Sequence, residues 1–539
     1  MSLGAMQDWP LRVTQLVDHA EREHGDTEIV SAWGDGRVTH TNWSDVARDA
    51  RRMARALERL GVKRGDRVAT LAMNHAHHLI CWYGTAGMGG ILHTINPRLF
   101  DDQLEYIANH AEDRVLLYDR AFAPIVERMK PRWKTIEHYI CMDPAGGEDG
   151  FPQWIAAEDG NYAWAEGDER DPCGLCYTSG TTGNPKGVLY EHRSTVLHTM
   201  AEASPDIFDL SQRAVVLPIV PMFHANAWGV PWAAPMVGCK LVLSADYRPE
   251  SMCRLFREEK VTHSAGVPTV WLTMIEHIES TGEDLGVLKR VTIGGAAAPR
   301  AMIKWFRDRG IDVNHAWGMT ETSPIGTCGA RPLRWDELSE DDKLDHIACQ
   351  GRAPFGVELR VVDDEGKVQP RDGKSSGRLQ ARGPWVVKRY FKAEEDATDE
   401  EQWFDTGDVA VLHPDGTMQI TDRSKDVIKS GGEWISSIEL ENAAVGCGGV
   451  AEAAAIAIPH PKWDERPLLL VVRAAGGEVG EAEIREHLRK HVPNWWQPDA
   501  IEFVDELPHT ATGKLSKLIL RERFTDYRFA NASEMIGRD

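Results

Sequence analysis

Residues 177–188 read Tyr-Thr-Ser-Gly-Thr-Thr-Gly-Asn-Pro-Lys-Gly-Val and directly follow the apolar run Gly174-Leu175-Cys176. Glycines let backbone N–H groups turn toward anionic oxygens, hydroxyls donate further hydrogen bonds, and Lys186 adds a positive charge. It is not the Walker pattern, in which the lysine directly follows the last glycine and precedes Ser or Thr. A surface loop that binds nothing can have a similar composition. The order of these residues favours a loop that holds phosphate.

The bulk properties limit the possible functions. At 539 residues the chain is long enough for at least two domains, and its formal charge of −22 argues against binding to nucleic acid. No apolar run approaches the ~20 residues of a membrane helix. Charged residues interrupt the N-terminus, which lacks a signal-peptide core. The nine scattered cysteines fit a reducing compartment. We therefore expect a cytoplasmic protein without an integral membrane segment.

Cys173 and Cys176 form a Cys-x-x-Cys pair, the spacing of half a zinc site. The sequence offers no second pair of this kind to complete such a site. Cysteine also behaves as a small apolar residue. We predict that both lie in a buried strand that leads into the 177–188 loop.

Helices and strands alternate along the first part of the chain. Apolar spacing predicts a helix over 43–60, and apolar runs predict strands over 67–71, 114–118, 240–243 and 291–293. Such alternation favours parallel sheets covered by helices, with ligand loops at the strand C-terminal ends.

A change in the sequence pattern predicts the domain organisation. Residues 351–420 read as short strands separated by glycine-rich turns, which predicts a β-rich subdomain. A charged segment then precedes a fresh α+β pattern. We expect an N-terminal domain over 1–422, a hinge over 423–427 and a small C-terminal α+β domain over 428–539.

Further motifs follow the first loop in a fixed order. They include Pro-Met-Phe-His-Ala-Asn-Ala-Trp at 221–228, His-Ala-Trp-Gly-Met-Thr-Glu at 315–321 and Ser-Gly-Gly-Glu-Trp-Ile-Ser-Ser at 430–437. Nearly the whole chain resembles the acyl-adenylate-forming superfamily of acyl-CoA synthetases, peptide-synthetase adenylation domains and luciferases. Within it, the motifs look like bacterial medium- and long-chain fatty acid–CoA ligases, and methylmercaptopropionate–CoA ligases share their texture.

The resemblance implies an α/β fold with a large N-terminal domain and a mobile C-terminal lid, and a reaction in two halves. A carboxylate attacks the α-phosphate of ATP to give acyl-AMP and pyrophosphate, and coenzyme A then displaces AMP. Two anions repel each other, so the site must supply cations and oriented donors.

The resemblance also implies the ATP site. Thr178 and Glu321 hold Mg²⁺, a role that suits oxygen ligands, and Glu321 counts among the catalytic residues. Lys186 orients the β- and γ-phosphates. An exposed helix-start carboxylate is the plainer interpretation of Glu321, but its motif favours the metal role. The other implied nucleotide-binding positions are Ser179, Gly180, Thr181, Thr182, Ala225, Gly295, His315, Ala316, Trp317, Thr320, Asp408, Arg423, Lys425, Lys429 and Trp434.

Two of these positions need comment. The family normally has Tyr where this chain has Trp317; an indole can stack on adenine, but the tyrosine hydroxyl's hydrogen bond is lost. Asp408 resembles the acid that accepts both ribose hydroxyls, a task for a two-oxygen acceptor, although a turn aspartate is the plainer interpretation. Arg423 is expected near the ribose and phosphate, and Lys425 matches the position about which the small domain turns.

Lys514, in Thr-Ala-Thr-Gly-Lys, is the strongest catalytic candidate. In the resembling enzymes this lysine contacts both the carboxylate and the α-phosphate during adenylation and leaves for thioester formation. An ammonium on a long stem can bridge two anions. A surface lysine is the plainer interpretation, and Lys517 close by is the assignment to guard against.

The acyl pocket follows from the same resemblance. His224 matches the residue that lines the carboxylate side, also named as catalytic, and Trp228 matches the aromatic that gates the fatty-acid tunnel. Gly294, Gly295 and Ala296 resemble a tight backbone wall beside the adenylate. A histidine or tryptophan among apolar residues is otherwise a core residue. The sequence does not give the chain length of the acid.

Three functions remain to be compared. We predict an ATP-dependent acyl-CoA ligase for a medium-chain fatty acid or a methylmercaptopropionate-like short acid, with a long-chain acid as an alternative. ATP and coenzyme A are its substrates and Mg²⁺ its metal, and the resemblance implies a homodimer. An enzyme that loads a carrier protein is the second possibility. A non-catalytic binding relative is the third, against which Lys186, Glu321, Asp408 and Lys514 argue together.

Overall fold

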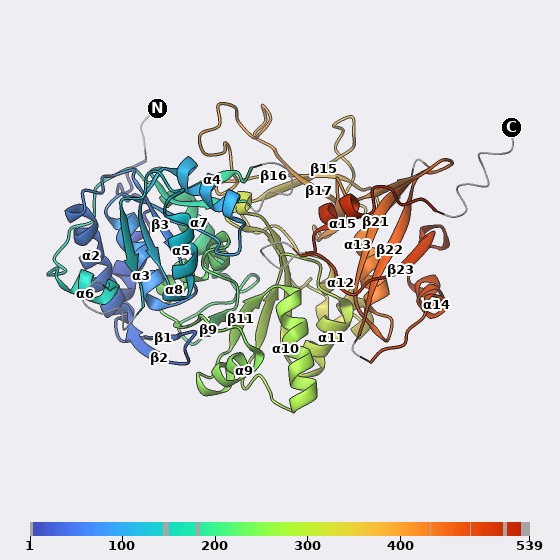
Figure 1. The fold of residues 1–539 in the computed structure, drawn as a ribbon, viewed down its shortest axis with the longest axis horizontal. Helices are drawn as coiled ribbons and strands as arrows, with labels where there is room; N and C mark the ends of the chain where they lie inside the picture. Colours follow the sequence, from blue (N-terminus) through green and yellow to red (C-terminus); the bar gives the residue numbers. More distant parts are fainter. Residues whose placement is uncertain are drawn as a thin grey trace.

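In this computed structural model, residues 4–143, 150–178, 184–431, 433–474, 476–509 and 515–529 are described. They form two large sheets that contain mostly parallel strands, a smaller antiparallel sheet and a C-terminal α+β unit (Figure 1). The predicted α/β fold class, with a separate small C-terminal unit, is confirmed. No described helix combines the length and apolar character needed to cross a membrane.

The first sheet carries the phosphate loop. Its described strands, in spatial order, are β6 (His138–Cys141), β5 (Asp113–Tyr118), β3 (Arg67–Leu71), β4 (Ile91–Thr94), β7 (Pro172–Tyr177) and β8 (Gly187–Glu191). Only the β7–β8 pair is antiparallel. The predicted loop is therefore the connection of a hairpin at the edge of this sheet. Cys173 and Cys176 are buried in β7, as predicted.

The second sheet lies beside the first. Its described strands, in spatial order, are β14 (Ile325–Cys328), β13 (Asp312–Gly318), β12 (Arg290–Ile293), β11 (His263–Gly266), β9 (Val215–Pro218), β10 (Lys240–Ser244), β1 (Glu28–Ala32) and β2 (Val38–Asn42). The strands from β13 to β1 pair in parallel. The predicted motifs at 221–228 and 294–296 begin just after β9 and β12, and the motif at 315–321 begins within β13 and runs past its end, so one edge of the sheet receives all three.

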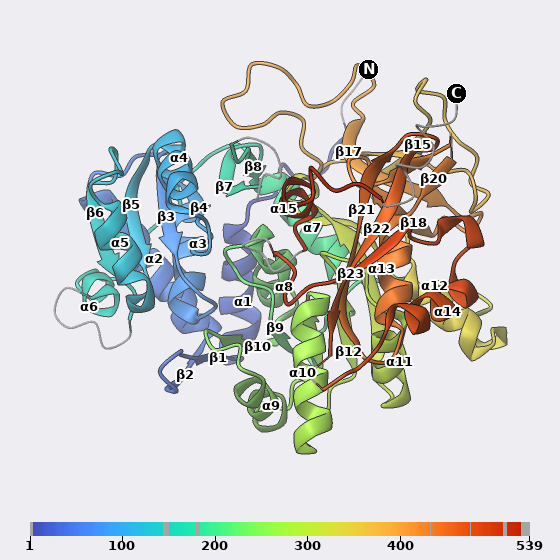
Figure 2. The ribbon, with the colours of Figure 1, turned by 45° about the vertical axis from the view of Figure 1, so that its right-hand side comes forward.

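Helices cover both faces of these sheets. The helices that pack on the first sheet or between the two are α1 (Thr14–His24), α2 (Trp43–Arg59), α3 (Ala76–Gly87), α4 (Asp101–Ala111), α5 (Ala123–Met129), α6 (Phe151–Ala156), α7 (His192–Glu202) and α8 (Val230–Val237). The other face of the second sheet packs on α9 (Pro249–Glu258), α10 (Pro268–Thr281), α11 (Arg300–Asp308) and α12 (Glu340–Ala348). Figure 2 shows α9, α10 and α11 together at the lower end of the molecule.

Helix α2 illustrates why these segments fold as they do. Val46, Met53 and Leu57 recur at helical spacing and are fully buried against the central core. The Asn42 side chain accepts a hydrogen bond from the Asp45 backbone N–H at 2.8 Å and caps the first turn. The predicted helix over 43–60 and strands over 67–71, 114–118, 240–243 and 291–293 are confirmed to within a residue or so.

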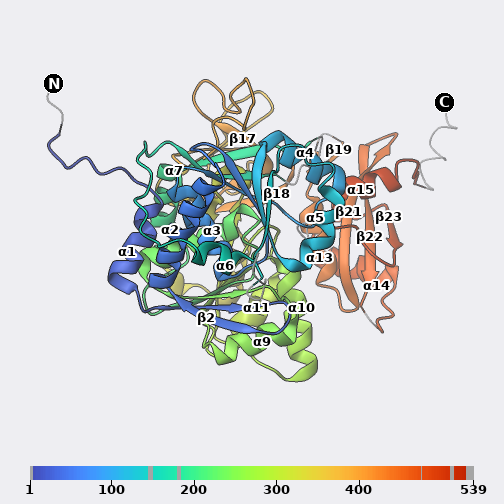
Figure 3. The ribbon, with the colours of Figure 1, turned by 60° about the vertical axis from the view of Figure 1, so that its left-hand side comes forward.

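The later part of the chain forms two further sheets. The antiparallel sheet comprises β15 (Glu358–Val362), β16 (Gly377–Arg382), β17 (Phe404–Leu412) and β18 (Met418–Arg423). The C-terminal unit comprises β19 (Ile428–Ser430), β20 (Glu433–Ile435), β21 (Val450–His460), β22 (Asp464–Arg473), β23 (Ala500–Phe503), α13 (Ser437–Val445), α14 (Glu481–His491) and α15 (Lys517–Arg523). Figure 3 shows α14, α15 and β21–β23 gathered at the side opposite α1. The expected domain boundaries at 422 and 427 stay a prediction.

Candidate active site

A cavity of about 480 Å³ lies where the strand ends of the two large sheets meet the C-terminal unit. It brings together segments that are far apart in the sequence, including both sides of the phosphate loop and the turn after β13. The predicted residues that line it are Thr178, Lys186, His224, Ala225, Trp228, Gly294, Gly295, Ala316, Trp317, Thr320, Glu321, Arg423 and Lys425.

Several predicted residues do not line this cavity. Ser179, Gly180, Thr181, Thr182 and Lys514 lie outside the described residues. The described residues Ala296, His315, Asp408, Lys429 and Trp434 are absent from the lining. The His315 ring is buried and bonded to backbone on both sides, since its Nε2 lies 3.2 Å from the Ala298 N–H and its Nδ1 2.9 Å from the Ala348 carbonyl. That ring therefore holds the wall of the cavity rather than facing into it.

The two ends of the phosphate loop are tied together. The backbone N–H of Thr178 donates to the Lys186 carbonyl at 2.9 Å, and the Lys186 N–H donates to the Thr178 hydroxyl at 3.2 Å. The Lys186 ammonium lies 4.8 Å from the centre of the Tyr390 ring. These contacts keep both residues at the cavity, where a hydroxyl and a cation can meet an anionic ligand.

Glu321 approaches Lys186 from the other sheet. It follows β13 and is only 7% exposed, so the plainer interpretation of an exposed carboxylate does not hold. The Tyr390 hydroxyl donates to Glu321 Oε1 at 2.9 Å. Burial raises the pKa of Glu321, and the Tyr390 hydrogen bond opposes that shift. The cavity thus holds a buried carboxylate close to a hydroxyl and an ammonium.

At the predicted nucleotide end, three side chains form a chain of bonds. The Trp317 indole Nε1–H donates to Asp408 Oδ2 at 2.8 Å, and Arg423 Nε lies 2.6 Å from Asp408 Oδ1. Asp408 is only 2% exposed and directly follows the lining residues Thr406 and Gly407 in the chain. Trp317 therefore replaces the expected tyrosine with a donor of its own, which points at the predicted ribose-binding carboxylate.

At the predicted acyl end, the wall of the cavity has an unusual backbone. Ala225, Asn226, Ala227 and Trp228 have φ values of 41°, 56°, 48° and 57°, and Gly229 follows at 95°. Left-handed backbone costs roughly 1–2 kcal/mol for each residue with a Cβ, so the surroundings must enforce this turn. Trp228 is 8% exposed, and a Cβ added to Gly294 would lie 3.2 Å from its ring tip. Phe208, Pro324 and Ile325 are further apolar residues that line the cavity.

The C-terminal unit closes the cavity. Leu515 and Ser516, which directly follow Lys514 in the chain, line it. Lys517 is buried at the start of α15, with Nζ 2.7 Å from Glu441 Oε1 and 2.5 Å from the Ser437 hydroxyl. Burial opposes the charge, but Glu441 raises the pKa of Lys517. The ammonium of Lys517 is therefore engaged within the C-terminal unit.

The sequence missed some lining residues. They are Asn184, Phe208, Gly318, Met319, Pro324, Ile325, Tyr390, Thr406, Gly407, Ser424, Asp426, Leu515, Ser516, Lys517, Leu518 and Arg521. Several directly adjoin predicted residues in the chain, so the same motifs could have identified them. Tyr390 is different, because nothing around it in the sequence pointed to a site.

Comparison with known proteins identifies the family. A sequence model of the AMP-binding enzyme family matches residues 16–391, and one of the AMP-binding enzyme C-terminal domain matches residues 439–514. The chain belongs to the AMP-binding enzyme family. Members of this family form acyl-adenylates from ATP.

Named relatives span nearly the whole chain. The 3-methylmercaptopropionyl-CoA ligase of Ruegeria lacuscaerulensis is 47% identical over 97% of this chain and 99% of its own. The medium-chain-fatty-acid–CoA ligase of Ectopseudomonas oleovorans is 46% identical over 99% and 100%. The long-chain-fatty-acid–CoA ligase of Thermus thermophilus is 45% identical over 97% and 97%.

A solved structure agrees with the fold. An anthranilate CoA ligase in complex with anthranoyl-AMP superposes with a TM-score of 0.86 at 25% identity, covering 96% of this chain and 99% of that one. The predictions of the superfamily and of an ATP-dependent acid–thiol ligase that uses coenzyme A are confirmed. The roles of individual residues stay predictions.

Proposed function

We propose that this AMP-binding enzyme activates a short carboxylic acid with an apolar end, of the 3-methylmercaptopropionate kind, and transfers the acyl group to coenzyme A. The position of Trp228 carries the proposal. Its indole lies almost buried at the acyl end, with its tip against Gly294. The apolar side chains of Phe208 and Ile325 line the same cavity, and we infer that the indole limits the room for the acyl chain to that of a short acid.

The same cavity supports the proposed roles at the reacting groups. Thr178 and Glu321 fit an Mg²⁺ site, because hydroxyl and carboxylate oxygens are the ligands that this ion prefers and both line the cavity. The bound ion would offset charge on the phosphates. Lys186 would hold the phosphates, and His224 would face the carboxylate of the acid.

Lys514 is the proposed residue that bridges the acid and the α-phosphate. Support comes from its neighbours Leu515 and Ser516, which line the cavity in this orientation of the C-terminal unit. Turning of that unit about residues 423–427 would then withdraw Lys514 for the second half-reaction. A homodimer, which rests on the resemblance alone, and a cytoplasmic location, which rests on the sequence properties given above, remain part of the proposal.

A medium-chain fatty acid is the second candidate. Trp228 stands on the strained turn over 225–229, and a change of that turn would move the indole and lengthen the pocket. The medium-chain relative, at 46% identity, supports this alternative almost as well as the first relative supports a short acid. The two candidates differ in chain length only, so one assay separates them.

The test is AMP release with ATP, Mg²⁺ and coenzyme A over a panel of acids: propionate, methylmercaptopropionate, butyrate, hexanoate, octanoate, decanoate and palmitate. We expect the highest kcat/KM at methylmercaptopropionate or butyrate. A maximum at octanoate would favour the second candidate. Absence of acid-dependent AMP release across the panel, with a purified carrier protein as the active acceptor instead, would overturn the proposal.

A further inference from the structure

Tyr390 joins the two halves of the proposed phosphate site. Its hydroxyl donates to Glu321 Oε1 at 2.9 Å, and its ring lies under the Lys186 ammonium at 4.8 Å. It lines the cavity together with both residues, although it belongs to a different segment from either. One side chain therefore contacts the proposed metal ligand through its edge and the proposed phosphate ligand through its face.

We propose that Tyr390 is a positioning residue for nucleotide binding, which fixes the Glu321 carboxylate relative to the Lys186 ammonium. This inference rests on the proposed function. A carboxylate on a flexible stem and a lysine lose side-chain entropy when they converge on one ligand. A phenol has few rotamers, so a ring anchored between them sets their separation before the ligand arrives.

Backbone hydrogen bonds hold the segment that carries Tyr390 on both sides of this residue. On one side, the Val387 N–H donates to the Glu321 carbonyl at 2.7 Å. On the other, the Phe391 N–H donates to the Gly187 carbonyl at 2.8 Å, in the strand that follows the phosphate loop. Tyr390 thus lies between two backbone bonds, one to each half of the site.

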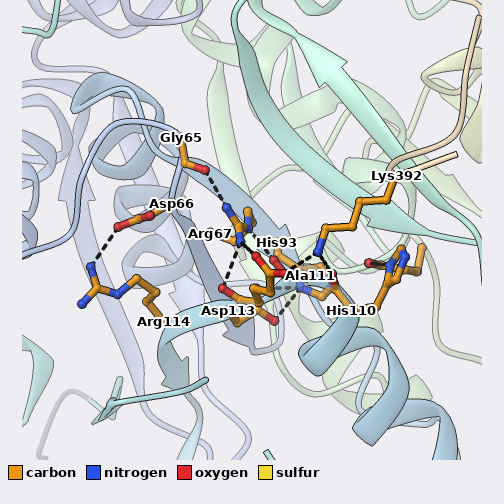
Figure 4. A network of polar contacts seen from close by, with 11 residues as sticks. Gly65, Asp66, Arg67, His93, His110, Ala111, Asp113, Arg114 and Lys392 are labelled. Atoms are coloured by element: carbon orange, nitrogen blue, oxygen red, sulfur yellow. Dashed lines mark hydrogen bonds and ion pairs between the residues drawn. The ribbon is translucent and has the colours of Figure 1, made fainter. Parts of the chain in front are cut away.

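Lys392 adds a third attachment, to the C-terminal end of helix α4 (Figure 4). Its Nζ lies 2.8 Å from the His110 carbonyl and 2.7 Å from Glu112 Oε1, at the end of α4. This contact is partly exposed, so we count it as a restraint on the position of the segment and not as a source of stability. Together with the backbone hydrogen bonds of Val387 and Phe391, the Lys392 contact restricts movement of the segment that carries Tyr390.

A plainer interpretation is that Tyr390 only satisfies a buried carboxylate. That role would stabilise the fold and leave the nucleotide unaffected. The two interpretations differ in a measurable way, because a positioning residue acts through Glu321 and its effect must vanish when the Glu321 charge is absent. A double-mutant cycle separates them.

The experiment measures the dissociation constant of α,β-methylene-ATP by calorimetry, with and without Mg²⁺ and without any acid, so that no turnover is needed. The variants are Tyr390→Phe, Glu321→Gln and the double substitution. We expect Tyr390→Phe to weaken Mg²⁺-dependent binding about ten-fold, as for loss of a hydrogen bond to a charged group, and to change nothing further in the Glu321→Gln background. Phenylalanine keeps the ring under Lys186, so the hydroxyl alone is tested.

Tyr162→Phe is the matched control. Its hydroxyl also donates to a carboxylate, Glu58 Oε1 of α2 at 2.7 Å, but neither residue lines the cavity. It should leave nucleotide binding unchanged. As a second variant, Tyr390→Leu removes the ring as well, and we expect a further loss that disappears when Lys186→Met is also present.

Each outcome decides the matter. Unchanged binding by Tyr390→Phe, or an equal loss in both Glu321 backgrounds, overturns the inference while the proposed function stands. A wild-type chain whose nucleotide affinity does not depend on Mg²⁺ overturns the metal role of Glu321 and the inference together. A lower melting temperature for Tyr390→Phe with unchanged nucleotide affinity assigns Tyr390 to the fold alone.

Discussion

The nucleotide end and the acyl end of the cavity are built by different means. At the nucleotide end, side chains bond one another in sequence, as in Trp317 to Asp408 to Arg423 at 2.8 and 2.6 Å. At the acyl end, the wall is apolar and its form comes from backbone, including the left-handed turn over 225–229. The contrast fits the proposed ligands, because ATP offers fixed polar groups to bond whereas acids differ mainly in length and bulk. We therefore expect recognition of ATP to depend on side-chain identity and recognition of the acid to depend on shape.

The largest effect is expected from substitution of Lys514, the proposed bridge between the acid and the α-phosphate. We expect Lys514→Ala to lower the rate of acyl-adenylate formation by about 100- to 1,000-fold, because one donor to the developing charge is lost. Thioester formation from supplied acyl-AMP should stay close to wild type. Pyrophosphate exchange measures the first half-reaction, and thioester release measures the second. Equal loss of both half-reactions would contradict the proposal that Lys514 acts in adenylation alone and is withdrawn for thioester formation.

Lys517 provides the comparison for Lys514, because it lies three residues further on and is buried. Lys517→Met leaves Glu441 without the ammonium at 2.7 Å, and we expect the free energy of unfolding in urea to fall by about 3 kcal/mol. Replacing Glu441 by Leu in the same chain should recover part of the loss. Under conditions where the variant is folded, its adenylation rate should fall far less than that of Lys514→Ala. A stable Lys517→Met variant without adenylation would show that the reacting lysine was assigned wrongly.

At the acyl end, Trp228→Ala should change selectivity. Removal of the indole lengthens the pocket, so we expect the kcat/KM ratio of octanoate to methylmercaptopropionate to rise by about 50-fold, within the range for methylene discrimination in an apolar pocket. KM for ATP should change little, since the bonds that join Trp317, Asp408 and Arg423 do not involve Trp228. Trp228→Phe, which keeps an aromatic, is the milder control. An equal rise in KM for ATP would break the separation of the two ends.

The sequence predicted the local parts of this architecture well. The helix over 43–60 and the strand ends depend on neighbouring residues, and a resemblance of whole motifs supplied fewer than half of the residues that line the cavity. Contacts between distant segments were not predictable. Tyr390 meets Glu321 from 69 residues away in the chain, and Trp317 meets Asp408 from 91.

Two further differences have physical causes. His315 belongs to a predicted nucleotide motif, but backbone groups of Ala298 and Ala348 bond its ring and turn it away from the cavity. The left-handed turn over 225–229 contains a single glycine, Gly229, so sequence gave no sign of it. At Gly229 itself a Cβ would collide with the buried Glu202 carboxylate, which explains that one residue but not the four before it.

The smallest effect is expected from Trp317→Phe, which tests the nucleotide end at a single bond. The phenyl ring can still stack on adenine, but Asp408 loses its indole donor and keeps Arg423. We expect KM for ATP to rise about five-fold, as for one net hydrogen bond, with kcat and the order of acid preference unchanged.

Trp271→Phe is the matched control for this substitution. Trp271 is fully buried in the core of the second sheet, and its Nε1 has no hydrogen-bond partner among the described residues. Its replacement should lower stability without changing KM for ATP. If both variants raised KM alike, the Trp317 effect would reflect packing and not the bond to Asp408. A change in acid preference with Trp317→Phe would mean that the two ends are coupled through the Gly294–Ala316 wall, since a Cβ on Gly294 would lie only 2.9 Å from the Ala316 carbonyl.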